Sequence, residues 1–308
     1  MSNFVELGKK IYNLQNPKEA RRFAVFVARC YFHSGKMQRL EDFFAQSETL
    51  SEIAANFPFV YEQVTRAFFY NKSTFNSRIK LLEEHMIYLT RTMSREFLTQ
   101  LYSGQKILLW TMPIDENLGE LRLSFCISGG QRKEGLMSVI LELSDNTPVY
   151  QIMFWIAQEN LIFQGEDFAM WIGAMQGPNI EDSRDLIKIL TKKCHAYRTK
   201  NLILYAAQAV ARSLNLKKIF AVTNAGYYAN NHIRSDRKLK TSFSDFWLEC
   251  GGTETGDDRF FTLPLIEARK TFDEMPTHKR AVYRRRFKLL DEIDAAVAEK
   301  IQTFKRGA

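Results

Sequence analysis

The stretch Lys218-Ile219-Phe220-Ala221-Val222-Thr223 (residues 218–223) decides the fold, because it is the clearest buried strand in the sequence. A short apolar run rich in β-branched and aromatic residues is typical of a strand covered on both faces. Helical periodicity flanks this run on both sides. The spacing predicts helices over 183–197, 201–214 and 241–249, and a last strand over 259–263. This alternation indicates an α/β arrangement after Pro178.

Upstream of Pro178, five short β-rich runs are separated by turn residues such as Gly129-Gly130 and Asp145-Asn146. The predicted strands cover residues 106–111, 119–127, 136–143, 149–156 and 168–175. Short connections of this kind join neighbouring antiparallel strands. We therefore expect an antiparallel meander in which residues 129–135 form a hairpin connection.

The first third of the chain is predicted to be helical. Asn16-Pro17 indicates a helix start, because asparagine caps helices and proline fits the first helical position. The apolar residues after it repeat at helical spacing: Phe23, Phe26, Val27, Cys30 and Tyr31. The predicted fold class is α+β, with a helical domain over residues 1–104 and a mixed, mainly antiparallel α/β domain over 105–308. A basic helix over 277–303 closes the second domain.

The composition is that of a globular protein, with 308 residues of which 45% are hydrophobic and 25% charged. This balance excludes a disordered or fibrous chain. The four cysteines never form CxxC and the five histidines never form HExxH, so we predict reduced, mostly buried thiols and no metal site. No apolar stretch approaches the ~20 residues that span a bilayer, and no signal peptide is evident. We expect a cytoplasmic protein.

Positive charge is concentrated in one segment. Residues 183–250 hold 13 Lys and Arg but only 4 Asp and Glu, so their net charge is +9, against +8 for the whole chain. A second basic cluster covers residues 278–288. If these segments converge on one cavity, they form a basic basin that attracts phosphorylated cofactors, nucleic acid or acidic headgroups. The alternative is a solvated surface whose charges face water or pair locally.

Several segments make the C-terminal part of the chain similar to the VirK/YbjX family of Gram-negative bacteria. They are Trp171–Gly177, Thr191–Arg198, Leu202–Leu214, Ala221–Asn224, Phe246–Gly252, Lys279–Ala281, Tyr283–Phe287 and Leu289–Asp291. The resemblance implies an association with virulence, intracellular survival and tolerance of cationic antimicrobial peptides. It supplies no biochemical activity.

The order of the predicted elements also resembles the fold of GCN5-related N-acetyltransferases. In that fold a helix N-terminus after a central strand binds the cofactor pyrophosphate through backbone N–H groups. The resemblance implies that Gln176 and Gly177, which lead into the helix at Ser183, have this role here. The chain lacks the Gln/Arg-x-x-Gly-x-Gly/Ala loop of those enzymes. The donor stays open between an acyl-CoA and an aminoacyl-tRNA.

Three residues are candidates for catalysis. His195 would titrate near neutral pH, Asn224 follows the buried strand where α/β sheets present ligand-facing groups, and Tyr283 could donate a proton. Each has a structural alternative: a helix-dipole contact for His195, a turn for Asn224 and packing for Tyr283. The candidates for binding a phosphorylated donor are Gln176, Gly177, Lys192, Arg198, Arg234, Arg237, Arg280 and Arg284.

Other polar residues have less specific patterns. Tyr227, Tyr228, Asn230 and His232 crowd one loop and could serve either function or turn formation. We interpret Glu249 as the partner of an arginine.

These features lead to the hypothesis of an acyl- or aminoacyl-transferase that acts on an anionic or amine-bearing substrate, such as a peptide or envelope precursor. The alternative is a non-catalytic binding protein whose basic basin docks RNA, a partner protein or an anionic membrane surface. A third hypothesis is a peptide-modifying transferase whose helical domain recognises a leader peptide.

Overall fold

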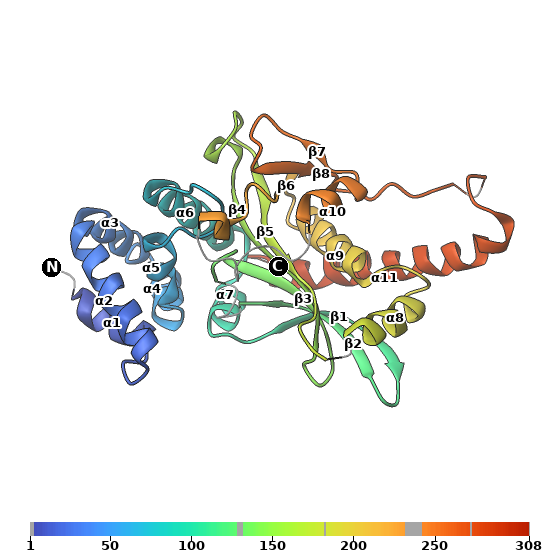
Figure 1. The fold of residues 1–308 in the computed structure, drawn as a ribbon, viewed down its shortest axis with the longest axis horizontal. Helices are drawn as coiled ribbons and strands as arrows, with labels where there is room; N and C mark the ends of the chain where they lie inside the picture. The colour runs from blue at the N-terminus through green and yellow to red at the C-terminus, as the bar shows by residue number, and fades with distance from the viewer. Residues whose placement is uncertain (1–2, 128–131, 182, 232–241, 272, 308) are drawn as a thin grey trace.

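The computed structural model describes residues 3–127, 132–181, 183–231, 242–271 and 273–307. In these residues the strands form one eight-stranded sheet in the order β1-β2-β3-β4-β5-β6-β8-β7 (Figure 1). The strands are β1 (Ile107–Asp115), β2 (Gly119–Cys126), β3 (Met137–Leu143), β4 (Pro148–Gln158), β5 (Phe168–Gln176), β6 (Lys218–Val222), β7 (Thr253–Glu254) and β8 (Phe260–Leu263). The predicted α+β class and the five-strand meander are confirmed.

The pairing of β5 with β6 is parallel, whereas every other pairing in the sheet is antiparallel. A parallel pair needs a long crossover, which α8 (Ser183–Lys193) and α9 (Thr199–Ser213) supply. The paired register covers only Ala169–Ile172 of β5 and Lys218–Ala221 of β6. Beyond it, the last residues of β5 continue without β6, so the two strands part at their carboxyl ends.

Helices cover both faces of the sheet. Figure 1 shows α6 (Phe75–Thr92) and α9 on opposite sides of β4 and β5. The long helix α11 (Arg280–Phe304) packs on α9 and β1. Strand β3 is therefore buried along its whole length, and most of β4 and β5 is buried as well.

Of the remaining helices, α1 to α5 lie beyond α6, in blue in Figure 1, whereas α7 and α10 lie beside the sheet. These helices are α1 (Phe4–Ile11), α2 (Pro17–Phe32), α3 (Ser34–Phe44), α4 (Glu48–Asn56), α5 (Phe59–Thr65), α7 (Arg95–Tyr102) and α10 (Phe243–Glu249), of which α10 follows β6 in the chain. The predicted cap is confirmed, because Asn16 Oδ1 accepts a hydrogen bond from Lys18 N at 3.0 Å. Buried side chains of both parts of the chain form one continuous core, and the division into domains at residue 104 stays a prediction.

Some boundaries differ from those predicted. Helix α8 ends at Lys193 rather than near residue 197, because His195 and Ala196 adopt positive φ angles of 54° and 57°. Such angles do not continue a helix. The two-residue strand β7 escapes detection because it is too short for a periodic pattern. The predicted hairpin over 129–135 and the helix start at Thr241 lie partly outside the described residues.

Aromatic rings join the parallel pair to the rest of the core. The indole of Trp171 on β5 stacks between Trp155 of β4 and Phe220 of β6, at centroid distances of 6.2 and 4.4 Å. Tyr70 lies in the segment between α5 and α6, and its ring stacks on Trp155 at a centroid distance of 6.2 Å. Such ring pairs add to area burial. The stacked rings fix the α5–α6 segment over the central strands.

Two further predictions concern the thiols and the membrane. Cys30, Cys126 and Cys194 are buried and Cys250 is half-buried, as expected for mostly buried thiols. None of the helices in the described part of the chain is long and apolar enough to cross a bilayer.

His85 of α6 ties the helices to the centre of the sheet. Its Nδ1 accepts a hydrogen bond from the backbone N–H of Ile156 at 3.0 Å, so Nε2 carries the proton and contacts the Tyr102 hydroxyl at 3.1 Å. The ring is fully buried, and this burial lowers the pKa of His85 to about 3. His85 therefore stays neutral in the folded protein at any moderate pH.

We expect His85→Gln to lower the free energy of unfolding by about 1–3 kcal/mol at pH 7, because the Ile156 N–H loses a well-placed acceptor. As pH falls below about 6.5, only the unfolded wild type gains a proton at this position, so the wild type loses up to about 1.4 kcal/mol per pH unit. The difference in unfolding free energy between the wild type and His85→Gln should therefore become smaller as the pH falls from 6.5 to 4.5. Urea unfolding at both pH values measures it, and a gap that widens on acidification would contradict the assignment.

Candidate functional site

Four loops meet at the carboxyl end of β6, and we call this region the loop junction. The loops cover residues 66–73, 132–135, 223–231 and 255–259. The carboxyl ends of parallel strands are where open α/β sheets place their ligand sites. The loop junction lies where β5 and β6 part, so its position in the fold makes it the candidate ligand site.

A bulge in β5 brings the second loop against the sheet. The register of β4 and β5 shifts at Gly173, which stands unpaired between Ile172 and Ala174. A Cβ at Gly173 would lie 1.9 Å from the carbonyl oxygen of Glu134. Only glycine therefore permits this approach. The bulge seats the backbone of Glu134 directly on the strand.

The side chain of Glu134 has unusual acid–base properties. Its carboxylate accepts a hydrogen bond from the Tyr227 hydroxyl at 3.0 Å. Burial raises the pKa of Glu134 to about 7, although the Tyr227 hydrogen bond and the charge of Lys133 act in the opposite direction. A carboxyl that titrates near neutral pH suits general acid–base catalysis, and such shifts are common at functional sites.

The helical part of the chain holds this carboxyl in place. Gln63 of α5 is fully buried, and its Nε2 donates to the carbonyl oxygens of Arg132 and Gly135 at 2.6 and 3.0 Å. The carboxylate of Glu62, also buried, accepts a hydrogen bond from Arg132 Nε at 2.8 Å. The residues on both sides of Glu134 are therefore fixed by one turn of α5.

Tyr227 is fixed from two directions. It pairs with Tyr70 through an isolated β-bridge, and its ring meets the ring of Phe243 edge-on at 5.7 Å. Burial raises the pKa of Tyr227, and the nearby carboxylate of Glu134 raises it further. The phenol therefore keeps its proton and remains a donor to Glu134.

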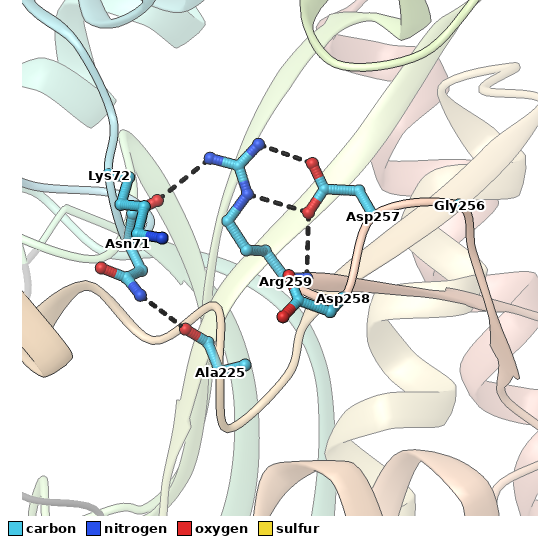
Figure 2. Close-up of a pocket in the computed structure, with 7 residues that line it drawn as sticks. All are labelled: Asn71, Lys72, Ala225, Gly256, Asp257, Asp258 and Arg259. Carbon is cyan, nitrogen blue, oxygen red and sulfur yellow. Dashed lines mark hydrogen bonds and ion pairs between the residues drawn. The ribbon is translucent and has the colours of Figure 1, made fainter.

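A cavity of about 570 Å³ opens at Ala225, which lies two residues before Tyr227 in the same loop. It is lined by Asn71, Lys72, Ala225, Gly256, Asp257, Asp258 and Arg259 (Figure 2). The guanidinium of Arg259 donates to both carboxylate oxygens of Asp257, at 2.8 and 2.5 Å, and to the carbonyl oxygen of Asn71 at 3.1 Å. Lys72 and Asp258 form no ion pair within the described part of the chain. The cavity thus has polar walls of both charges.

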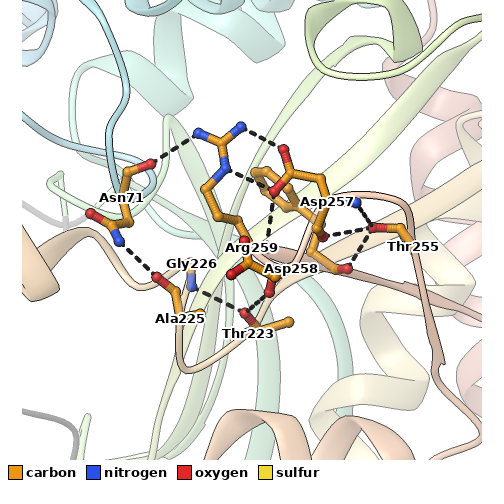
Figure 3. Close-up of polar contacts among 9 residues, drawn as sticks. Asn71, Thr223, Ala225, Gly226, Thr255, Asp257, Asp258 and Arg259 are labelled. Atoms are coloured by element: carbon orange, nitrogen blue, oxygen red, sulfur yellow. Dashed lines mark hydrogen bonds and ion pairs between the residues drawn. The ribbon is translucent and has the colours of Figure 1, made fainter.

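Backbone contacts lock the cavity to the loop that carries Tyr227. Figure 3 shows Thr223 donating to the carbonyl oxygen of Asp258 at 2.6 Å and accepting from the N–H of Gly226 at 3.0 Å. The N–H of Asn71 donates to the carbonyl oxygen of Gly226 at 2.7 Å. A Cβ at Gly226 would lie 2.0 Å from the carbonyl oxygen of Arg259. These loops therefore pack backbone against backbone.

Of the predicted catalytic residues, Asn224 lies within the loop junction. Its Oδ1 accepts from the N–H groups of Phe243 and Ser244, at 2.7 and 3.3 Å, and its Nδ2 donates to Ser242 Oγ at 2.9 Å. The side chain thus binds the first turn of α10, a positioning role in line with the structural alternative. Its predicted part in catalysis stays a prediction.

His195 and Tyr283 come together at a different place, the turn between α8 and α9. Arg286 of α11 donates to the carbonyl oxygens of His195 and Ala196 at 3.1 and 2.9 Å, and its guanidinium lies over the Tyr283 ring at 4.4 Å. Burial lowers the pKa of His195, and the charges of Arg285 and Arg286 lower it further. This histidine would be neutral at pH 7.

Two predicted donor-binding residues, Gly177 and Arg198, both lie near Tyr150 of β4. A Cβ at Gly177 would lie 3.1 Å from the ring of Tyr150, and the charge of Arg198 opposes the effect of burial on the pKa of Tyr150. Gln176 is the last residue of β5, paired with Gln151. Arg198 forms an ion pair with Glu249, as predicted for that carboxylate. Asn224 therefore contacts the first turn of α10, and Arg198 contacts Glu249, the last residue of the same helix.

The other predicted donor-binding residues are more scattered. Lys192 is exposed on α8 and Arg284 is exposed on α11, whereas Arg280 is half-buried at the start of α11. Arg234 and Arg237 lie outside the described residues, as does His232. The cavity at Ala225 is lined by other residues.

Three cations of residues 183–250 form ion pairs with acids elsewhere in the chain. Lys193 pairs with Asp115 at 3.2 Å, Lys218 pairs with Glu159 at 2.6 Å, and Arg212 pairs with Asp294. These acids lie on β1, next to β4 and on α11. The convergence of the basic segments on one cavity stays a prediction. Within the described residues, no group of His, Cys, Asp and Glu could hold a metal ion.

Comparison with known proteins gives a family and relatives. Residues 15–299 match the model of a family described as "Protein of unknown function (DUF535)". The chain is 30% identical to the uncharacterized protein YbjX of Escherichia coli over 72% of this chain and 67% of the relative. An uncharacterized protein of Haemophilus influenzae is 26% identical over 89% and 87%, and the membrane protein LapB of Mannheimia haemolytica is 24% identical over 70% and 85%. No solved structure matches the chain.

Glu134→Gln should make the protein more stable above pH 7, because glutamine can still accept the Tyr227 hydrogen bond but carries no buried charge. In the wild type the pKa of Glu134 rises from 4.5 to about 7 on folding, so stability is lost as pH increases through this range. We expect the variant to exceed the wild type by roughly 1–3 kcal/mol at pH 8 and to match it near pH 4.5.

Urea unfolding at the two pH values tests this expectation. Glu116→Gln is the control, because Glu116 is exposed in the turn between β1 and β2. Equal stability of wild type and Glu134→Gln at pH 8 would show that the carboxyl is not held in a shifted state.

Gly226→Ala should destabilise the protein by about 1–3 kcal/mol, because the new methyl group would overlap the backbone of Arg259. Gly256→Ala is the matched control from the same cavity, since nothing lies within 4 Å of a Cβ built there. Thermal unfolding of both variants measures the difference. An equal loss of stability in the two would refute the close packing of the loops.

Proposed function

The chain belongs to the DUF535 family, as its resemblance to VirK/YbjX proteins predicted, and since that family's function is unknown we propose one from the loop junction: transfer of an acyl or aminoacyl group to an amine. The observation that carries this proposal is Glu134, a carboxyl with a pKa of about 7 that is hydrogen-bonded to Tyr227 where β5 and β6 part. The names of these relatives assign no reaction.

In the proposed step, an amine nitrogen attacks the carbonyl carbon of a thioester or ester. The Glu134 carboxylate takes a proton from that nitrogen as the new C–N bond forms. The C–S or C–O bond of the donor then breaks, and the proton passes from Glu134 to the leaving thiolate or alkoxide. A group that both accepts and returns one proton works best with a pKa near the working pH, which is the case here.

The start of α9 would hold the donor. This helix, rather than the predicted α8, packs on the sheet against β3, β4 and β6, and its first N–H groups have no helical partner. Arg198 and Lys200 flank this turn and share a single carboxylate, that of Glu249. One positive charge is left in surplus beside a helix N-terminus, an arrangement that favours phosphate groups.

The cavity at Ala225 would hold the amine. Two aspartates line it, and Asp258 forms no ion pair with any described residue. Because Arg259 already satisfies the carboxylate of Asp257, Asp258 is the acceptor that the N–H groups of a neutral amine can use. An amine-bearing acceptor, such as a peptide or an envelope precursor, matches this cavity.

The test uses acetyl-CoA, palmitoyl-CoA and a bulk aminoacyl-tRNA preparation as donors, with lysine, spermidine and a lysine-containing peptide as acceptors. With a productive pair, we expect Glu134→Gln to lower kcat about 100-fold or more and to leave donor affinity nearly unchanged. Arg198→Gln should weaken donor binding instead. Glu116→Gln is the control.

Two results would remove the proposal. One is that none of the three donors binds. The other is that Glu134→Gln keeps full turnover. Binding of RNA that decays steeply with salt and produces no turnover would favour the non-catalytic alternative.

A further inference from the structure

A second cavity, of about 540 Å³, lies among the helices, away from the loop junction. Its walls come from α3, α4, α6 and α7 and from Arg306, which follows α11. Its volume falls within the range of about 300–1,000 Å³ that is usual for small-molecule sites. None of the residues proposed above for acyl transfer lines it.

The floor of this cavity is apolar. It consists of Phe43, Leu50, Ile87, Met93 and Leu98. All but Ile87 are buried in the core, so core packing holds the side chains of the floor in place. An apolar chain laid on this floor would leave water without losing hydrogen bonds.

The rim carries positive charge. Three arginines line the cavity, and no Asp or Glu occurs among its described lining residues. Arg95 is neutralised from outside by Glu48 and Glu52. Arg91 and Arg306 are exposed, and neither pairs with a carboxylate in the described part of the chain.

Backbone hydrogen bonds set the position of Arg306. The N–H of Arg306 donates to the carbonyl oxygen of Thr92 at 3.0 Å, and the N–H of Ser94 donates to the carbonyl oxygen of Phe304 at 2.7 Å. Between them, Lys305 and Met93 form an antiparallel bridge. Residues 304–306, at the end of α11, are thus attached to the rim through an isolated β-bridge and its flanking hydrogen bonds.

Capping of α6 accounts for only part of this charge. Arg306 Nη1 donates to the carbonyl oxygen of Thr90 at 3.3 Å, a contact that complements the negative end of that helix. Among the residues that the structure describes, Arg91 makes no such contact. The positive end of α4, capped by Ser47, faces the same cavity and adds to the surplus.

From this combination we propose that the cavity binds an amphiphile with one apolar chain and an anionic head, either carboxylate or phosphate. The chain lies on the floor, and Arg91 and Arg306 hold the head at the rim. The proposal needs both parts of the lining. The hydroxyl and guanidinium groups of the rim alone would suit any anion, and the apolar floor alone would suit any hydrocarbon.

The experiment is isothermal titration of the full chain with saturated fatty acids of 8, 10 and 12 carbons, with dodecyl phosphate and with inorganic phosphate. We expect affinity to rise roughly fourfold for each added methylene that is buried. Dodecyltrimethylammonium, which has the same chain and the opposite charge, should not bind. A stronger signal for dodecyl phosphate than for dodecanoate would identify the head as phosphate.

The variant Arg91→Gln/Arg306→Gln should weaken dodecanoate binding at least tenfold. Arg21→Gln/Arg22→Gln is the matched control, because it removes the same charge from the exposed surface of α2. Unchanged affinity in the first variant would overturn the proposal. So would equal binding of the cationic amphiphile, or binding of inorganic phosphate with no dependence on chain length. The chain-length and head-group series need no variant, so they decide the matter even if the substituted protein fails to fold.

Discussion

The parallel alignment of β5 with β6 is the constraint on which the rest of the structure depends. In a sheet that is otherwise antiparallel, this one pairing requires the α8–α9 crossover, and it brings two carboxyl ends to the same edge. Antiparallel neighbours would have alternated their ends. The loops that follow these strands therefore gather in one place, and the early separation of β5 from β6 leaves room between them for side chains from elsewhere.

Glu134 occupies this space. Its side chain is partly removed from water, and its carboxyl forms no ion pair within the part of the chain that the structure describes. Removing a carboxylate from water costs free energy, and the protein responds by keeping the proton to a higher pH. The loop can bear this only because α5 fixes its backbone. Gln63 and Glu62 lie about 70 residues earlier in the chain than the atoms they hold, so the helical part is a component of the site.

Local patterns were sufficient for most of the secondary structure. The strand at 218–222 and the cap at Asn16 follow from composition and spacing within a few residues, because burial and capping are local requirements. Glu249 could also be assigned to an arginine, since it ends a helix in a basic region. Boundaries failed where single residues adopt unusual backbone angles, as at His195.

The candidate site could not be read in the same way. The sequence analysis named Tyr227 but not Glu134, because Glu134 follows basic residues and glycines that are typical of a solvated turn. The two residues are separated by 93 positions in the sequence. The periodicity of a sequence does not predict contacts between residues so far apart. Its composition does not predict which carboxyl group will be removed from water. The ion pairs of Lys193, Arg212 and Lys218 could not be predicted for a related reason, because the acid that each of them contacts is distant in sequence.

The bridge between Met93 and Lys305 also bears on how the chain is made. During synthesis the helices on either side of Met93 leave the ribosome long before residues 304–306, yet they share a surface with them. Domains usually fold in order of synthesis. Here the helical part can complete its packing only after α11 has been made, so this surface forms late in the synthesis of residues 1–308.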